Sequence, residues 1–217
     1  SQVAYGFIFS AEYKQKHTSN AEFATMLYHT MMDREPDEAG LTDWVDKLNY
    51  TNTREYVFNG FLFSTEFARR CAASGINIGN AVETPDATDA WQMNVQILAL
   101  CNEQRQNNGL EKLMTREDLW EQVAQVRARE IVDYFSHIRP NGENCFSLYE
   151  EAGLDYCTAG ENIAGGQSGA PQVVNAWMNS ETHRGNILEE SYEYLATGYA
   201  AGGAYGTNYC QNFLGDW

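Results

Sequence analysis

The sequence predicts an α+β protein with a separate all-helical N-terminal part. Apolar residues recur at helical spacing through most of the chain, while strand-like runs appear only near the C-terminus. A segment of the first third also occurs twice. Helices followed by strands are typical of domains in which helices cover an antiparallel sheet. We therefore expect a helical module over residues 1–80, a linker over 81–91 within a polar, turn-rich stretch, and a second domain over 92–217.

The repeated segment organises the N-terminal module. "GFIFSAEYKQK", from Gly6, returns as "GFLFSTEFARR", from Gly60, 54 residues later. A recurrence of this length indicates duplicated helical units that stack on each other. The spacing of apolar residues between the copies predicts helices over 20–32, 35–48 and 53–63. The printed chain is thus expected to open on the tail of one unit and to contain one nearly complete unit after it.

The second domain is predicted to alternate helices and loops before its strands. Helices are expected over 89–109, 115–135, 146–154 and 170–180. The strand-like runs cover 192–200 and 209–215, with a turn at Gly202 and Gly203. The glycine-rich stretch between Cys157 and Pro171 is expected to be a loop.

Composition excludes several classes of protein. The net charge of −16 repels phosphate backbones, which argues against a nucleic-acid partner. No apolar run is long enough for a transmembrane segment, which needs about 18 residues. The five cysteines contain no Cys-x-x-Cys spacing. Cys145 and Cys157 are one candidate disulfide, and five reduced cysteines are the alternative.

A candidate site emerges from one acid and two histidines of the second domain. Glu161 is the single carboxylate of the glycine-rich stretch, which has neither of the glycine spacings that bind phosphate. His137 and His183 each lie where a helix is expected to end. Titratable groups at the ends of structural elements are typical of sites carried on a rigid scaffold.

The motifs around these residues resemble the CAP superfamily. "FSHIRPNG", "AGENIAGGQ", "NSETHRGNIL" and "YCQNFLG" occur in the order expected of its bacterial, secreted, SCP-like branch, over about residues 92–215. The resemblance implies a three-layer α-β-α sandwich whose shallow cleft presents two histidines and two acids, a set that holds a divalent metal in some members. "MDREPDEAGLTDWVDKL" and "GFLFSTEF" resemble a helical repeat module of bacterial secreted and cell-surface proteins. Together they imply an extracellular or cell-surface location, with the module as a candidate link to the cell envelope.

Carried over by motif, the metal ligands would be His137, Glu161, His183 and Glu181. Imidazole and carboxylate together suit zinc or a similar divalent cation. Glu181 and His183 are two residues apart, so on one α-helix they would point to nearly opposite sides. They converge only if the helix stops near Ser180. Asn162 is expected to tie down the loop of Glu161, and Gln211 is a candidate to reach the cleft from a strand.

Two functions remain open at this stage. The first is a non-enzymatic extracellular protein whose cleft binds a divalent cation and a peptide, glycan or lipid. The second is a metal-dependent hydrolase, a peptidase or a cell-wall-acting enzyme, in which Glu161 or Glu181 acts as general base. A third reading gives the residues no chemistry, with His–Glu hydrogen bonds that simply hold loops over the sheet.

Overall fold

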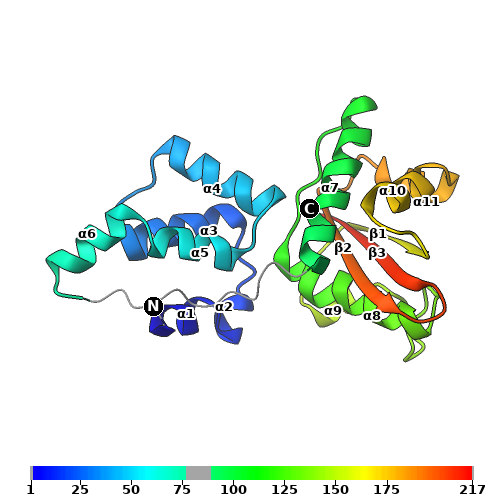
Figure 1. Ribbon diagram of the computed structural model, residues 1–217, viewed down its shortest axis with the longest axis horizontal. Helices are drawn as coiled ribbons and strands as arrows, with labels where there is room; N and C mark the ends of the chain where they lie inside the picture. Colours follow the sequence, from blue (N-terminus) through cyan, green and yellow to red (C-terminus); the bar gives the residue numbers. More distant parts are fainter. Residues whose placement is uncertain (1, 77–88, 217) are drawn as a thin grey trace. The chain divides into compact units, whose positions relative to one another are not determined.

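The computed structural model describes residues 2–76 and 89–216 (Figure 1). The chain divides into two compact units, Ser1–Asp86 and Ala87–Trp217. Most of the predicted linker, residues 81–91, lies outside the described residues, and its last three residues belong to the first helix of the second unit. Across the described ranges, no helix has both the length and the apolar character needed to cross a bilayer.

The N-terminal unit is built of short helices with side-chain caps. Ser10, Ser19, Asp37, Thr53 and Ser64 each accept a hydrogen bond from a backbone N–H in the first turn of the following helix. These caps explain why the predicted helix starts are close to the observed ones. The elements are α1 (Gln2–Ile8), α2 (Ala11–Lys14), α3 (Asn20–Leu27), the π-helical η1 (Tyr28–Met32), α4 (Glu38–Tyr50), α5 (Arg54–Leu62) and α6 (Thr65–Ala73).

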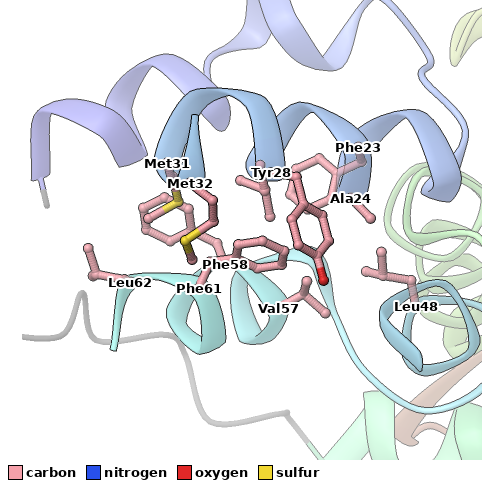
Figure 2. Close-up of a cluster of buried hydrophobic side chains, with 11 residues drawn as sticks. Phe23, Ala24, Tyr28, Met31, Met32, Leu48, Val57, Phe58, Phe61 and Leu62 are labelled. Atoms are coloured by element: carbon pink, nitrogen blue, oxygen red, sulfur yellow. The ribbon is translucent and has the colours of Figure 1, made fainter. Parts of the chain in front are cut away.

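The core of this unit lies between α3–η1, α4 and α5 (Figure 2). Phe23 and Leu27 of α3 face Val57, Phe58 and Phe61 of α5, and all five are buried. Partly buried residues of α4 and of the α1–α2 pair close the cluster from two further directions; they include Trp44, Leu41, Tyr5, Ile8 and Phe9. The apolar residues whose spacing predicts the helices over 20–32 and 53–63, among them Phe23, Leu27, Val57 and Phe61, are thus buried on one side of each helix.

The second unit is a three-stranded antiparallel sheet covered by helices. Its strands follow the order β1-β3-β2, so β3 is central and β1 is an edge strand. The hairpin predicted near the C-terminus is present as β2 and β3. The elements are α7 (Asp89–Asn107), the π-helical η2 (Leu119–Ala124), α8 (Gln125–Asp133), α9 (Ser147–Glu151), β1 (Thr158–Gly165), α10 (Ala170–Met178), α11 (Glu181–Ile187), β2 (Tyr194–Gly202) and β3 (Gly206–Gly215).

Helices cover both faces of this sheet (Figure 1). On one face, Ala196 and Leu214 pack with η2 and α9, and Ile163 and Cys210 pack with α8. On the other, Gln211 bonds Cys101 of α7, and Asn162 bonds α11. This arrangement confirms the expected three-layer α-β-α sandwich.

The prediction of a loop at the glycine-rich stretch is wrong, because residues 158–165 form β1. The glycines serve close packing on a strand. A Cβ at Gly160 would overlap the hydroxyl of Tyr192, and one at Gly165 would lie 2.8 Å from the ring of Tyr205. Aromatic rings of other segments therefore lie directly on the backbone of β1, where larger residues would collide.

The candidate disulfide between Cys145 and Cys157 is not formed. Cys145 is a buried free thiol, whereas Cys157 is exposed and its Sγ donates to the carbonyl oxygen of Gly215, 3.2 Å away. The five cysteines are all free thiols, as the alternative prediction had it.

Candidate functional site

Glu161 lies in the middle of β1 with its carboxylate beneath the surface. Its side chain is only 1% exposed. Arg127 of α8 donates from Nε to Oε2 over 2.8 Å and from Nη2 to Oε1 over 3.2 Å, which makes a two-pronged ion pair. Oε1 also accepts a hydrogen bond from Nδ1 of His137 over 2.8 Å, and Oε2 accepts one from Sγ of Cys210 over 3.3 Å. All the lone-pair positions of this carboxylate are therefore in use.

Arg127 also ties the segment before His137 to α8. Its Nη2 donates to the carbonyl oxygen of Ser136 over 2.6 Å, and its Nη1 donates to Glu130 over 2.6 Å. Glu130 is bonded in turn by Arg139, which lies just after His137. A fully buried guanidinium thus anchors both Glu161 and the loop that carries His137.

The side chain of His137 is half exposed, at 55%, although its Nδ1 is held by a buried carboxylate. Glu161 is kept ionised by Arg127 and can only accept, so Nδ1 of His137 must carry the proton. In the neutral imidazole the lone pair then belongs to Nε2. The pair presents an imidazole of fixed tautomer and orientation at the surface.

Two effects compete for the charge of Glu161. Burial raises its pKa, but the hydrogen bonds from His137 and Arg127 lower it by more, and the pKa lies below its ordinary value. The same negative charge affects the thiols beside it. Burial first, and the Glu161 charge second, raise the pKa of Cys145 to about 12 and that of Cys210 well above its usual range. Neither cysteine is a thiolate at neutral pH, so neither is a nucleophile here.

The next residue of β1, Asn162, serves the opposite face of the sheet. Adjacent residues of a strand point to opposite faces, so Glu161 is directed to α8 and Asn162 to α11. The Nδ2 of Asn162 donates to the carbonyl oxygen of His183 over 3.1 Å, and Asn186 donates to Oδ1 of Asn162 over 2.8 Å. Since β1 is an edge strand, His137 and His183 approach the same sheet edge from its two faces.

His183 shows the effect of this approach. Burial lowers its pKa, and the charge of His137 lowers it further. The charge of His137 thus affects His183, and a site shared by the two histidines stays a prediction. His183 does not lie where a helix ends, however, but within the first turn of α11.

Glu181 does not join them in a metal cluster. A helix does stop just before Ser180, but Ser180 is the N-cap of a new helix that contains both Glu181 and His183. Glu181 is exposed and, two residues away on one helix, points to nearly the opposite side from His183. Within the described ranges no three His, Cys, Asp or Glu side chains are placed to hold a metal ion. With the oxygens of Glu161 already occupied, the predicted four-residue ligand set does not fit this geometry.

Gln211 lies beneath the site and is completely buried. Its Oε1 accepts from Asn162 over 3.1 Å, and its Nε2 donates to Cys101 over 3.2 Å. It thus supports Asn162 from below and does not reach the surface beside the histidines.

Exposed apolar side chains flank His137. Tyr134, Phe135 and Ile138 are its neighbours in the chain, and each is 40–48% exposed. The ring of Phe135 lies 4.8 Å from that of Tyr205, which is exposed at the turn between β2 and β3. We call Phe135 and Tyr205 the aromatic patch.

Sequence reasoning missed Arg127, although a signal was present. Val123, Arg127 and Ile131 recur at four-residue spacing, which places an arginine on the core-facing stripe of its helix. A buried arginine requires a partner, and the lone carboxylate of the glycine-rich stretch was the available one. The third reading, a His–Glu hydrogen bond that holds a loop, is realised in part by His137 and Glu161.

Comparison with known proteins shows two family matches. Residues 98–213 match the cysteine-rich secretory protein family (CAP), and residues 4–71 match a domain of unknown function, DUF4214. Among curated proteins, the uncharacterized protein YkwD of Bacillus subtilis is 35% identical over 150 residues, which are 68% of this chain and 56% of that protein. The uncharacterized membrane protein YlbC of the same organism is 35% identical over 128 residues, 56% of this chain and 34% of that protein.

Among solved structures, an extracellular protein containing an SCP domain from Bacillus anthracis is 30% identical. It aligns with a TM-score of 0.53 over 63% of this chain and 45% of that one. The chain therefore spans about half or less of the length of these relatives.

Proposed function

Because this chain belongs to the cysteine-rich secretory protein (CAP) family, we propose that it is an extracellular bacterial protein that binds a ligand at the His137 surface without turning it over. Its similarity to a solved extracellular SCP-domain protein supports the location. The observation that carries the proposal is the buried Arg127–Glu161 pair beneath an exposed, oriented imidazole. Burial of a charge pair is costly unless geometry and hydrogen bonding are good, and here they hold one surface side chain in place.

The geometry favours binding over hydrolysis. A general base needs a free oxygen and a pKa near the working pH. Both oxygens of Glu161 are bonded to other groups, and its pKa is lowered. Glu181 is on the far side of α11 from His183. Neither acid of the hydrolase hypothesis is placed to activate a water molecule between the histidines.

Metal binding by the predicted four residues has the same difficulty. Zinc sites use three or four protein ligands, and Glu161 would have to give up Arg127 to become one. Removing the partner of a buried charge costs about 3–5 kcal/mol. The proposed function therefore uses no metal ion held by these four residues.

The surroundings of His137 support one chemical class of ligand. Nε2 is a hydrogen-bond acceptor in the neutral ring, and the aromatic patch beside it offers flat apolar faces. Aromatic anchors beside a few placed polar groups are characteristic of binding surfaces. The ligand is thus expected to combine an apolar face with a hydroxyl or amide donor, as the sugar rings of bacterial cell-wall glycans do.

Co-sedimentation with insoluble peptidoglycan tests this proposal. We expect the intact protein to bind, and Phe135→Ala or His137→Ala to weaken binding about tenfold or more, since aromatic anchors typically contribute 1–2 kcal/mol or more. Tyr56→Ala, at an exposed aromatic residue of the N-terminal unit, is measured beside them and reports separately any binding by that unit.

The same samples report on turnover. Soluble fragments should not accumulate above the buffer control. Equal binding by all variants would refute the assigned surface, and fragment release that disappears in His137→Ala would refute a purely binding role.

A further inference from the structure

The first helix of the chain carries an apolar face with no cover among the described residues. Val3 is 75% exposed and Phe7 is 74% exposed, one helical turn apart on α1. The repeat supplies an internal reference for this face. Val3 and Phe7 correspond, 54 residues later, to Val57 and Phe61 of α5, which are 0% and 2% exposed.

The reference copy shows which groups cover such a face. The ring of Phe61 lies 4.9 Å from that of Tyr28 in an edge-on contact, and 5.1 Å from that of Trp44 (Figure 2 shows Tyr28 and Phe61). Tyr28 continues α3 and Trp44 lies in α4. In a complete unit, therefore, the α3–η1 and α4 pair precedes α5 in the chain and buries its apolar face.

The glycines of the two copies identify the covering group independently. Gly60 is needed where it lies, because a Cβ there would sit 2.5 Å from the ring of Trp44. Gly6 holds the same repeat position, yet a Cβ at Gly6 would meet nothing within 4 Å. A glycine inside a helix lowers its stability by about 1 kcal/mol relative to alanine, and no neighbour of Gly6 accounts for it. The position is shaped for an indole that the described residues do not supply.

The other face of the α1–α2 pair is already covered. Phe9 lies 6.2 Å from Phe23 and 5.8 Å from Phe58, so the α1–α2 pair packs onto the unit that follows it. Its repeat counterpart Phe63, after α5, is 49% exposed. The α1–α2 pair and its repeat counterpart, the α5–α6 pair, thus each have one face for their own unit and another for the next unit, as stacked repeats require.

We propose that Val3, Gly6 and Phe7 form a stacking surface for the α3–α4 helix pair of a further repeat unit, joined N-terminally in the same chain. The tryptophan of that unit packs on Gly6 as Trp44 packs on Gly60. Only three residues separate α4 from α5 in the complete unit. A covalent neighbour therefore presents its helix pair at high effective concentration, whereas the corresponding pair of a second copy is already covered by its own α5.

A tandem variant tests this directly. Residues 1–54 are duplicated in front of Ser1, so that Arg54 of the added unit is followed by Ser1 and the repeat spacing is kept. We expect Gly6→Ala to increase hydrogen-exchange protection of α1 about fivefold in the 217-residue chain, since alanine favours an uncovered helix. In the tandem variant, the same change at the Gly6 after the added unit should reduce protection, because its Cβ meets the new tryptophan ring.

Gly60→Ala is the matched control and should reduce protection of α5 in both proteins. A second variant, Phe7→Ser, should change little in the 217-residue chain and lower protection of α1 at least tenfold in the tandem. An effect of Gly6→Ala with the same sign in both proteins, or an added unit that leaves α1 unprotected, would overturn the proposal. A dimer of the 217-residue chain that Phe7→Ser dissociates would assign the surface to a second copy instead, and would also overturn it.

Discussion

Arg127→Met should destabilise the second unit by about 3–5 kcal/mol at neutral pH, as expected when one partner of a buried ion pair is removed. The substitution keeps an apolar stem of similar length but removes both donors to Glu161, the donor to Glu130 and the donor to the Ser136 carbonyl. It leaves a carboxylate with 1% exposure facing only His137 and Cys210. An exposed pair such as Lys47 and Asp43 would contribute only about 0.3–0.5 kcal/mol.

Native-state hydrogen exchange read by mass spectrometry is the suitable assay. The central strand β3 reports the opening of the second unit, and peptides from α4 and α5 serve as an internal reference in the other unit. Arg129→Met is the matched control, since Arg129 lies on the same helix but is exposed, and its effect should stay within about 0.5 kcal/mol.

A double variant separates the charge from the packing. Arg127→Met combined with Glu161→Leu removes both charges, and it should recover part of the lost stability, because apolar replacement of a whole buried pair is often close to neutral. A cost below about 1 kcal/mol for Arg127→Met alone, or an equal cost for Arg129→Met, would refute the assignment of Arg127 as the anchor of Glu161.

Two further predictions concern the same sheet. The folded-state pKa of Glu161 lies below its unfolded value of about 4.3, so its contribution to stability is present above that pH and is lost as the pH falls through the folded-state pKa. Glu161→Gln should therefore lose less stability below pH 4 than the parent protein in acid denaturation. Identical slopes of stability against pH in the two proteins would contradict the assignment. Gly198→Ala should lower the free energy of unfolding in urea by at least about 1–3 kcal/mol, because its Cβ would overlap the carbonyl oxygen of Ala124 and force η2 away from β2. Gly185→Ala, at an open position of α11, is the control and should be neutral or stabilising.

Most of the fold could be predicted because its elements carry local signals. The helices have side-chain caps and apolar stripes, and both are legible in sequence. The strand β1 could not be predicted in this way. Its residues are rich in glycine, and its conformation is imposed by pairing with β3 across the whole of residues 158–165. That pairing joins segments about 50 residues apart, and the rings of Tyr192 and Tyr205 that require Gly160 and Gly165 follow them by 32 and 40 residues.

The hydrogen bond between His137 and Glu161 joins two of the residues that motif resemblance groups in one site. Motif resemblance places His137, Glu161 and His183 in one site because the order of the motifs carries that information, and their joint role as a site stays a prediction. The resemblance gave no information on how deeply the Glu161 carboxylate is buried, and this burial decides what the carboxylate can do. Glu161 on the surface would be a ligand or a base, whereas Glu161 beside a buried guanidinium supports another residue. Glu161 is buried because its side chain points to the face of the sheet that α8 covers.

Two neighbouring residues of β1 show how the edge strand organises this surface. Glu161 and Asn162 point to opposite faces, so each helical layer is linked to β1 by one side chain. Glu161 links the α8 layer through Arg127 and His137, and Asn162 links α11 through the backbone of His183. The central strand β3 also contacts both layers, through Cys210 and Gln211, but side chains of the two layers can approach each other past a strand only at the edge of the sheet. Because β1 is the edge strand, His137 and His183 are each linked to it from a different face, and a one-residue shift of its register would exchange the partners of Glu161 and Asn162.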